Sequence, residues 1–468
     1  MIRLKSFDRL CYQNLREGYL KRLVSSHAIA FDPCDILLDD KRNDGKSRKT
    51  YDILKARPAL VRLKDYLFDD CDKENPTVRR KHLRLLLVGP EEMPKSFGGD
   101  GDYDTMRQVF VEIIRQIGEI RMPSTNNPLK QARLGDWIEC KKIFKYGQLS
   151  RTNKSTPEKT AYWLQQQLHV DICPFCNRIY TSALFRGNIR PAFDHFYPKS
   201  VYPYLAISLF NLIPICDICN KAKSDNAEII VTDLTRDAND KTTSSKIKTP
   251  EPDSIIYPYD ESFDECLETN IPVHVSFRVI TDKAQVLRGQ SEQFTIQFHP
   301  TDDAGETLEG SSCNMLVPTD LGKRFPATLN KHLLNECFVA EGPTYWTRIK
   351  KSIYFLKLED LYNTHKNEIM HILRNRYQYN RAAIECILTS LLRADFLHKS
   401  SETPISDVQN DTLLLEARNM LYFANLDPDD WGLAPLNKLK ADILEQMDVL
   451  EMLCFDEDDL LGEDKKHG

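Results

Sequence analysis

The sequence predicts an α+β protein that is mostly helical, with a small cysteine-held module between helical regions and a small β element around residues 270–300. Three observations lead to this prediction. Apolar residues recur at helical spacing in both terminal parts, two tight cysteine pairs interrupt that pattern, and two later runs alternate apolar and polar side chains. We therefore expect three regions, namely residues 1–165, 166–230 and 231–468.

The composition is that of a soluble protein. Of the 468 residues, 41% are hydrophobic and 28% are charged. The longest apolar runs, such as LRLLLV at residues 83–88, are too short to span a bilayer. The opening MIRLKSFDRL lacks the apolar segment of a signal peptide. We expect a cytoplasmic protein that has no contact with a membrane.

The two halves of the chain carry opposite net charge. Residues 1–226 contain 38 lysines and arginines against 27 acidic residues, a net +11, whereas residues 227–468 contain 25 against 42, a net −17. A basic amino-terminal half fits an anionic partner such as nucleic acid. A chance distribution over solvated faces explains the asymmetry equally well, so charge alone does not identify the partner.

Helical periodicity dominates the amino-terminal region. The run at residues 105–120 places its apolar residues on one face and predicts an amphipathic helix. The preceding segment 90–104 is rich in Pro, Gly and Asp and predicts a loop. Residues 154–170 predict a second helix that begins at Thr156 and Pro157. Three of its residues are expected to face inward: Trp163, Leu164 and Leu168.

Downstream of the cysteine pairs, the polar stretch 235–254 predicts a linker or long surface loop. Apolar and polar residues then alternate over 273–279 and 294–298, which predicts two strands that pair as a hairpin or as part of a small sheet. Residues 358–373 have helical spacing, and residues 382–392 continue in the same style. We expect the acidic end of the chain to be frayed.

Four of the thirteen cysteines form two tight pairs. CPFC supplies Cys173 and Cys176, and CDIC supplies Cys216 and Cys219. Each C-x2-C knuckle offers two thiolates from one turn, so two knuckles complete the tetrahedral coordination of one zinc ion. Because sulfur takes all four positions, this zinc has no open site and is expected to be structural. It would hold together a module that is too short for a core of its own.

Other interpretations of the cysteines are less favoured. The cysteine number is odd, the chain is large and no export signal is found, so a disulfide framework is not expected. A redox protein that uses CxxC would show thiol chemistry without a bound metal. The remaining nine cysteines are scattered singly and are expected to be buried or incidental thiols.

The segment between the knuckles carries polar residues in an apolar setting. Asp194 and His195 are adjacent within RPAFDHFYPKS. A neutral imidazole titrates near working pH, so His195 can act as a general base. On a regular strand two successive side chains point to opposite faces, so this pair can act on one phosphate only if the strand twists or bends.

The motifs between residues 171 and 225 resemble those of the HNH endonucleases, whose active site is a ββα-metal unit. Their order is C-x2-C, D-H-x-x-P, then N-L-x-P-x-C-x-x-C-N-x-x-K. The resemblance implies that Asp194 and Asn220 bind a divalent metal and that His195 addresses the attacking water. It also implies that Asn211 ties the hairpin loop by hydrogen bonds.

The resemblance implies a hydrolase that cuts phosphodiester bonds of DNA. Two oxygen ligands favour magnesium or manganese over zinc as the catalytic metal. Lys223 lies one helical turn after Asn220 and is a candidate contact to a phosphate. One such unit cuts one strand, so a double-strand break requires a homo-oligomer or repeated action.

Each residue also has a structural interpretation. Alone, His195 would be a hydrogen-bonded core histidine and Asn220 a helix cap; the combined pattern favours a base and a metal ligand instead. Lys223 is as well explained by a solvated helix lysine, and Lys199 is expected at the surface. The nearby tyrosines are expected to pack the loop: Tyr197, Tyr202 and Tyr204.

Two short phrases outside the metal motif, residues 255–266 and 361–373, are similar to sequences in the PtuB-like nucleases of Septu-type anti-phage defence systems. Those nucleases work beside an ATPase, so the resemblance implies an ATPase partner that docks on the helical amino-terminal or acidic carboxy-terminal part. Two alternatives stay open. One is a restriction-type endonuclease that acts alone, and the other is a non-catalytic zinc-ribbon module that needs only the cysteines.

Overall fold

The structure is a computed structural model. It describes residue 4 and residues 8–37, 45–68, 80–117, 128–152, 158–183, 190–223, 255–263, 273–280, 283–300, 345–378 and 435–452. The described residues are mostly helical and include two two-stranded sheets, which agrees with the predicted α+β class.

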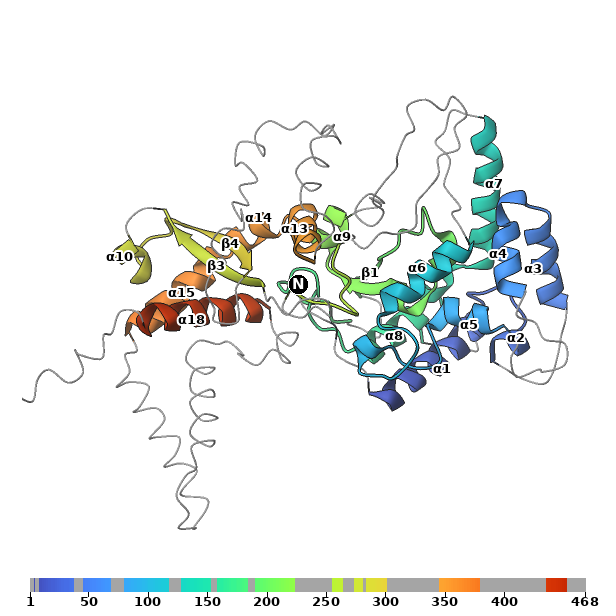
Figure 1. The fold of residues 1–468 in the computed structure, drawn as a ribbon, viewed down its shortest axis with the longest axis horizontal. Helices are drawn as coiled ribbons and strands as arrows, with labels where there is room; N and C mark the ends of the chain where they lie inside the picture. Colours follow the sequence, from blue (N-terminus) through green and yellow to red (C-terminus); the bar gives the residue numbers. More distant parts are fainter. Residues whose placement is uncertain are drawn as a thin grey trace, which may run out of the picture. The chain divides into compact units, whose positions relative to one another are not determined.

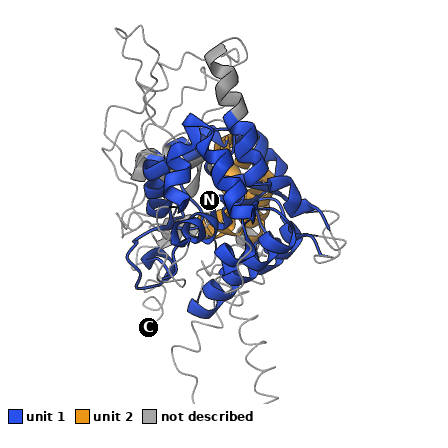
Figure 2. Ribbon diagram, turned by 90° about the vertical axis from the view of Figure 1, so that its right-hand side faces the viewer, with its two compact units in different colours: residues 1–269, 330–356 blue, residues 270–329, 357–468 orange. Residues whose placement is uncertain are grey.

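Contacts group the chain into two compact units, shown in blue and orange in Figure 2. The first unit comprises residues 1–269 and 330–356, and the second comprises 270–329 and 357–468. The cysteine-bearing segment therefore belongs to the same unit as the helices that precede it. The three functional regions expected from the sequence are a different division of the chain and stay predictions.

The first unit consists mainly of short helices around the β1–β2 hairpin (Figure 1). The bounds of its α-helices are α1 Arg9–Ser25, α2 Pro33–Leu37, α3 Gly45–Lys55, α4 Val61–Phe68, α5 Lys81–Val88, α6 Met106–Ile117, α7 Pro128–Ile143, α8 Thr160–Leu168, α9 Asp217–Lys223 and α13 Tyr345–Phe355. The bounds of its 3-10 helices are η1 Pro58–Leu60, η3 Lys95–Phe97, η4 Tyr146–Ser150, η6 Pro203–Leu205 and η7 Leu209–Asn211.

Helix α1 packs against the loop that follows His195. Asp8 caps its amino terminus by accepting a hydrogen bond from the Cys11 amide at 2.7 Å. Further along, the Tyr19 hydroxyl donates to the Ile207 carbonyl at 3.1 Å. The Tyr12 ring is stacked 5.8 Å from the Phe210 ring. Because Ile207 and Phe210 lie in the loop that follows His195, these contacts with α1 hold that loop in position.

Helix α6 confirms the amphipathic helix expected over residues 105–120. It spans Met106–Ile117, and the segment before it is a loop with the short helix η3, again as expected. The buried stripe consists of Met106, Val109, Phe110, Ile113, Ile114 and Ile117. For a helix this short, burial of the apolar stripe contributes more to stability than the helix propensity of its residues does.

The start predicted for the second helix was wrong. Helix α8 begins at Thr160, because Lys159 is extended and Glu158 forms a 2.6 Å ion pair with Arg22 of α1. Leu164 and Leu168 are buried as expected. Trp163 is only half-buried, and the Arg22 guanidinium covers its ring at 4.8 Å.

The β1–β2 hairpin and α9 follow one another in the order strand, strand, helix. Strand β1 (Ala192–His195) pairs antiparallel with β2 (Leu212–Ile215), and α9 begins two residues after β2 ends. The register is one-to-one, with Asp194 opposite Ile213 and His195 opposite Leu212. His195 is therefore the last residue of its strand, and the chain bends at Phe196.

In the second unit, β3 (Val273–Val279) pairs antiparallel with β4 (Phe294–Pro300), which confirms the predicted hairpin. Its α-helices are α10 Lys283–Leu287, α14 Leu358–Asn363, α15 Lys366–Gln378 and α18 Asn437–Met452. The helical spacing of residues 358–373 corresponds to two helices, α14 and α15, rather than to one continuous helix. The helical run is interrupted at Thr364, whose hydroxyl donates to the Leu361 carbonyl at 2.6 Å.

Three expectations lie outside the described residues: the loop at 235–254, the helical continuation at 382–392 and the acidic end of the chain. Within the described part, helices long and apolar enough to cross a membrane are not found.

Candidate functional site

The two cysteine pairs come together as one cluster. Cys173, Cys176, Cys216 and Cys219 are all buried, and their sulfur atoms all lie within 4.8 Å of one another. The sulfurs of Cys176 and Cys216 are 3.8 Å apart. Four 2.3 Å zinc–sulfur bonds at tetrahedral angles place sulfurs about 3.8 Å apart. The cluster therefore has the donor set and spacing to hold a metal ion such as zinc.

The first knuckle is shaped by a tight turn. The Asn177 amide donates to the Cys173 carbonyl at 2.8 Å, and Asn177 adopts the left-handed conformation with φ +48°. Asparagine tolerates this conformation better than most residues do. A bridge between Ile172 and Tyr180 closes the turn at its base. The turn thereby places both sulfurs of the first pair on one side.

The second knuckle lies at the junction of β2 and α9. The Asn220 amide donates to the Cys216 carbonyl at 2.9 Å, as in a first helical turn. The Cys219 amide lies 3.5 Å from the Cys216 sulfur, and its hydrogen bond stabilises a thiolate there. Hydrogen bonds from Cys173 and the other two thiols lower the pKa of Cys216, which opposes the effect of burial. The same junction thus positions both the metal cluster and the start of α9.

Asn211 ties the hairpin loop, as the motif implies. Its Oδ1 accepts from the Tyr197 amide at 2.7 Å, and its Nδ2 donates to the carbonyls of Tyr197 at 3.1 Å and Leu205 at 3.0 Å. The side chain is fully buried. Leu205 precedes Ala206, which contacts His195. Asn211 therefore holds in place the backbone against which His195 is oriented.

His195 is buried and has a defined tautomer. Its Nε2 lies 3.0 Å from the Ala206 carbonyl, and the side chain has 7% exposure. A carbonyl only accepts hydrogen bonds, so Nε2 carries the proton and Nδ1 keeps its lone pair. Burial lowers the pKa of His195 to about 3, and the positive charge of Lys199 adds to this effect. The imidazole is therefore neutral at neutral pH.

Asp194 forms a buried ion pair with Lys223. The Lys223 ammonium lies 3.1 Å from Oδ1 and 2.9 Å from Oδ2 of Asp194. It also donates to the His195 carbonyl at 3.0 Å. Both side chains are nearly inaccessible, at 1% for Lys223 and 6% for Asp194. Lys223 is thus neither a solvated lysine nor exposed to a phosphate in this structure, and a phosphate contact stays a prediction.

Asn220 lies one turn before Lys223 on α9. It is half-buried, and its side-chain amide makes no hydrogen bond to the described residues. Its oxygen is therefore available as a ligand, although its role as one is not tested. The bend expected between Asp194 and His195 is likewise untested. In the structure Asp194 contacts α9, whereas His195 contacts the loop at Ala206.

Sequence reasoning missed Tyr146, which lies in η4. Its ring stands edge-on to the His195 ring with centroids 4.6 Å apart, and the Lys199 ammonium lies 4.8 Å from its centroid. Burial raises the pKa of Tyr146, and the charge and hydrogen bond of Arg190 oppose part of this shift. No local pattern links Tyr146 to a histidine so distant in the sequence. The expected packing of three tyrosines is confirmed, since Tyr197, Tyr202 and Tyr204 are buried.

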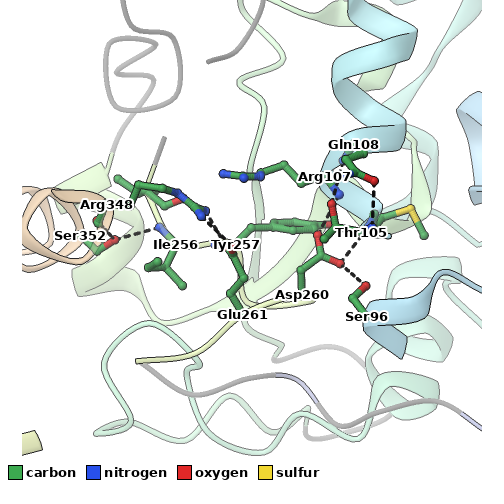
Figure 3. A network of polar contacts seen from close by, with 12 residues as sticks. Ser96, Thr105, Arg107, Gln108, Ile256, Tyr257, Asp260, Glu261, Arg348 and Ser352 are labelled. Atoms are coloured by element: carbon green, nitrogen blue, oxygen red, sulfur yellow. Dashed lines mark hydrogen bonds and ion pairs between the residues drawn. The ribbon is translucent and has the colours of Figure 1, made fainter. Parts of the chain in front are cut away.

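A buried segment, residues 255–263, forms a network of polar contacts with the surrounding helices (Figure 3). Asp260 accepts hydrogen bonds from the Ser96 hydroxyl at 2.7 Å and from the amides of Met106 at 2.9 Å and Arg107 at 2.8 Å. It therefore caps α6 from a distant part of the chain. Burial raises the pKa of Asp260 to about 6, although these hydrogen bonds oppose the shift.

The next residue of this segment, Glu261, forms a bidentate ion pair with Arg348 of α13, visible in Figure 3. Two tyrosines then reach the hairpin. The hydroxyls of Tyr257 and Tyr259 donate to the carbonyls of Phe210 at 2.5 Å and Leu212 at 2.9 Å. These carbonyls flank Asn211. The segment is thus an internal support of the hairpin.

Comparison with models of protein families, with curated proteins and with solved structures gives no match. Membership of the HNH endonucleases therefore rests on the motif residues and stays a prediction.

Proposed function

We propose that the chain is a metal-dependent endonuclease of the HNH type that hydrolyses phosphodiester bonds of DNA. The observation that carries this proposal is the state of His195. It is buried, held at Nε2 by the Ala206 carbonyl and left with an accepting lone pair at Nδ1. It also stands next to Asp194 on a strand that leads, through the hairpin, into the cysteine-bearing helix.

His195 acts as the general base in this account. Its neutral form can take a proton at Nδ1 from the attacking water, because Nε2 is already committed to the Ala206 carbonyl. Asn211 orients that carbonyl through the adjacent Leu205. The Tyr146 ring packs against the imidazole and limits its rotation. These contacts preorganise the base before substrate binds.

The four cysteines fit a structural zinc. Sulfur donors fill a tetrahedral site completely, so this ion would stabilise the hairpin and α9 and leave the chemistry to other groups.

A catalytic magnesium or manganese fits Asp194 and Asn220. The Asn220 amide is not engaged by described residues. In the described part of the chain, Lys223 is the cation that contacts the Asp194 carboxylate, and a carboxylate offers about four lone-pair sites. When bound, a divalent ion there would stabilise negative charge on the phosphate and the leaving oxygen. Lys223 would keep the carboxylate oriented.

Plasmid cleavage tests the proposal. The purified chain, loaded with zinc, is incubated with supercoiled DNA with and without magnesium or manganese. Nicked plasmid is expected only with the added divalent ion, since zinc in a closed site cannot take part. An intact plasmid with both metals would contradict the proposal.

A non-catalytic nucleic-acid-binding module is the second candidate. The ion pair of Asp194 with Lys223 favours it, because a carboxylate neutralised by lysine also serves as a purely structural core group. This candidate predicts DNA binding without cleavage under any metal. The plasmid assay therefore separates the two candidates.

The biological setting is proposed from the resemblance alone. We assign the nuclease to a bacterial anti-phage defence system in which an ATPase partner controls cutting. Co-purification with an ATPase encoded beside this chain is expected, and its failure would count against the assignment. A restriction-type enzyme that acts alone is the alternative. Cleavage of both strands would further require a homo-oligomer or two successive cuts.

A further inference from the structure

Two basic side chains, Lys199 and Arg190, contact Tyr146, whose ring packs on His195, and a third, Lys141, interacts with the charge of Lys199. The Lys199 ammonium lies on the Tyr146 ring, 4.8 Å from its centroid. The Arg190 guanidinium interacts with the Tyr146 hydroxyl and donates to the Ser150 hydroxyl at 2.7 Å. Both cations thus contact the aromatic ring that packs on the imidazole.

The third basic residue is Lys141, near the end of α7. Lys141 is exposed; partial desolvation of its ammonium lowers its pKa, and the positive charge of Lys199 lowers it further, so the two ammonium groups lie close enough to repel each other. The Lys141 ammonium lies 3.6 Å from the centre of the Trp137 ring, which keeps the lysine in place.

Among the residues that the structure describes, these three cations have no carboxylate partner. Within the described part of the chain, neither Lys141, Arg190 nor Lys199 has an ion pair within 4.0 Å. The neighbouring Lys142 differs, since its ammonium lies 2.7 Å from Glu139. Like charges held together without a counter-ion create a positive potential that an anion relieves.

The backbone that presents these residues is fixed. An antiparallel bridge joins Ile29 to Phe144, and the Lys145 amide donates to the Ala28 carbonyl at 2.7 Å. Helix α7 also packs against η6 in the loop after Lys199. Lys141 and Tyr146 are therefore held beside the hairpin loop rather than on a separate arm.

We infer that Lys141, Arg190 and Lys199 form a binding site for the phosphodiester backbone of a nucleic-acid strand beside His195. The site takes the phosphates that flank the one being cut, with the lysines as point charges and Arg190 as a planar donor. It rests on the proposed nuclease function and extends it to residues outside the metal motif. It also gives a role to Lys199, which was expected at the surface but is half-buried against the Tyr146 ring.

Binding of a fluorescein-labelled DNA duplex, followed by anisotropy without divalent metal, tests the inference. The unmodified chain is compared with Lys141→Gln, Lys199→Gln and the double variant. We expect the double variant to bind about 10-fold more weakly at moderate salt, with a salt dependence reduced by about one counter-ion per lysine. Lys142→Gln is the matched control and should bind as the unmodified chain does, because Glu139 already neutralises that residue.

The outcomes separate the inference from the proposed function. Zinc content and thermal midpoint confirm folding, and the exposed Lys141 supplies a variant that leaves the core intact. If the unmodified chain cuts plasmid but the double variant binds DNA equally well, the inference is overturned and the nuclease stands. If the unmodified chain neither binds nor cuts DNA, the proposed function itself fails. Equal weakening by Lys142→Gln would show a general charge effect and would also overturn the inference.

Discussion

The Lys223 ammonium lies 2.9 Å and 3.1 Å from the two carboxylate oxygens of Asp194, and both side chains are almost completely buried. The same ammonium donates to the backbone carbonyl of His195. Lys223 therefore connects the Asp194 carboxylate and the strand that carries His195 to helix α9, which contains Cys219. Replacement of Lys223 should therefore lower both the stability and the activity of the chain.

We predict that Lys223→Met destabilises the chain by about 3–5 kcal/mol, because the buried Asp194 carboxylate loses its counter-ion. The thermal unfolding midpoint measures this effect. Lys221→Met is the matched control, since Lys221 is exposed on the same helix. The double variant with Asp194→Asn should recover part of the loss. Equal midpoints for the Lys223 and Lys221 variants would show that the ion pair is not formed.

Cysteine replacement should remove the metal. Cys216→Ser is expected to lose bound zinc and to unfold the hairpin and α9, because the module depends on four sulfur ligands. Elemental analysis should give one zinc per unmodified chain. Cys11→Ser, at an exposed cysteine outside the cluster, should keep that zinc. A Cys216→Ser variant with full zinc content would rule out the four-sulfur site.

Two asparagines should respond in opposite ways. Asn211→Ala loses three buried hydrogen bonds and should cost about 2–4 kcal/mol of stability. Asn220→Ala should leave stability nearly unchanged, within about 0.5 kcal/mol, and reduce magnesium-dependent cleavage by about 100-fold. Thermal unfolding and the initial rate of plasmid nicking measure the two effects. An Asn220→Ala variant that cuts at the unmodified rate would refute its role as a ligand.

Asp260 should make stability depend on pH. Its pKa is raised from 3.8 to about 6 by burial, so the folded chain binds more protons than the unfolded chain between these values. The stability it contributes is complete below about pH 3.8 and is lost as the pH rises through about 6. The difference spans about 3 kcal/mol.

Thermal midpoints of the unmodified chain and of Asp260→Asn, measured from pH 4 to pH 7, test this expectation. The difference in midpoint between the unmodified chain and Asp260→Asn, in favour of the unmodified chain, should decrease as the pH rises. Asp102→Asn, at an exposed position in the preceding loop, is the control and should show a constant difference. A difference that grows with pH for Asp260→Asn would reverse the sign and contradict the assignment.

The spacing of apolar residues correctly predicted a helix and two strands, because each of these elements buries one face. The stripe of α6 and the alternation of β3 and β4 both encode a buried face, and both elements formed as expected. Helical spacing also runs on through Thr364, where the structure has a break. A side-chain hydrogen bond to the backbone ends the helix there, and hydrophobic periodicity does not register such a bond.

The candidate site was predictable where spacing fixes geometry. The two C-x2-C pairs predicted the four-sulfur cluster. The hydrogen bonds of Asn211 to the loop were implied by the resemblance to the HNH motif. Contacts between distant segments could not be derived in this way. The pairing of Lys223 with Asp194 and the packing of Tyr146 on His195 depend on how the hairpin folds against α9 and η4.

The most direct test of the central claim is the initial rate of plasmid nicking by zinc-loaded His195→Ala in magnesium. The account predicts that this rate falls to background while zinc content stays at one per chain, because the variant lacks the base but keeps the four sulfurs. His169→Ala, at an exposed histidine before the first knuckle, should cut at the unmodified rate. Nicking by His195→Ala at the rate of the unmodified chain would contradict the account.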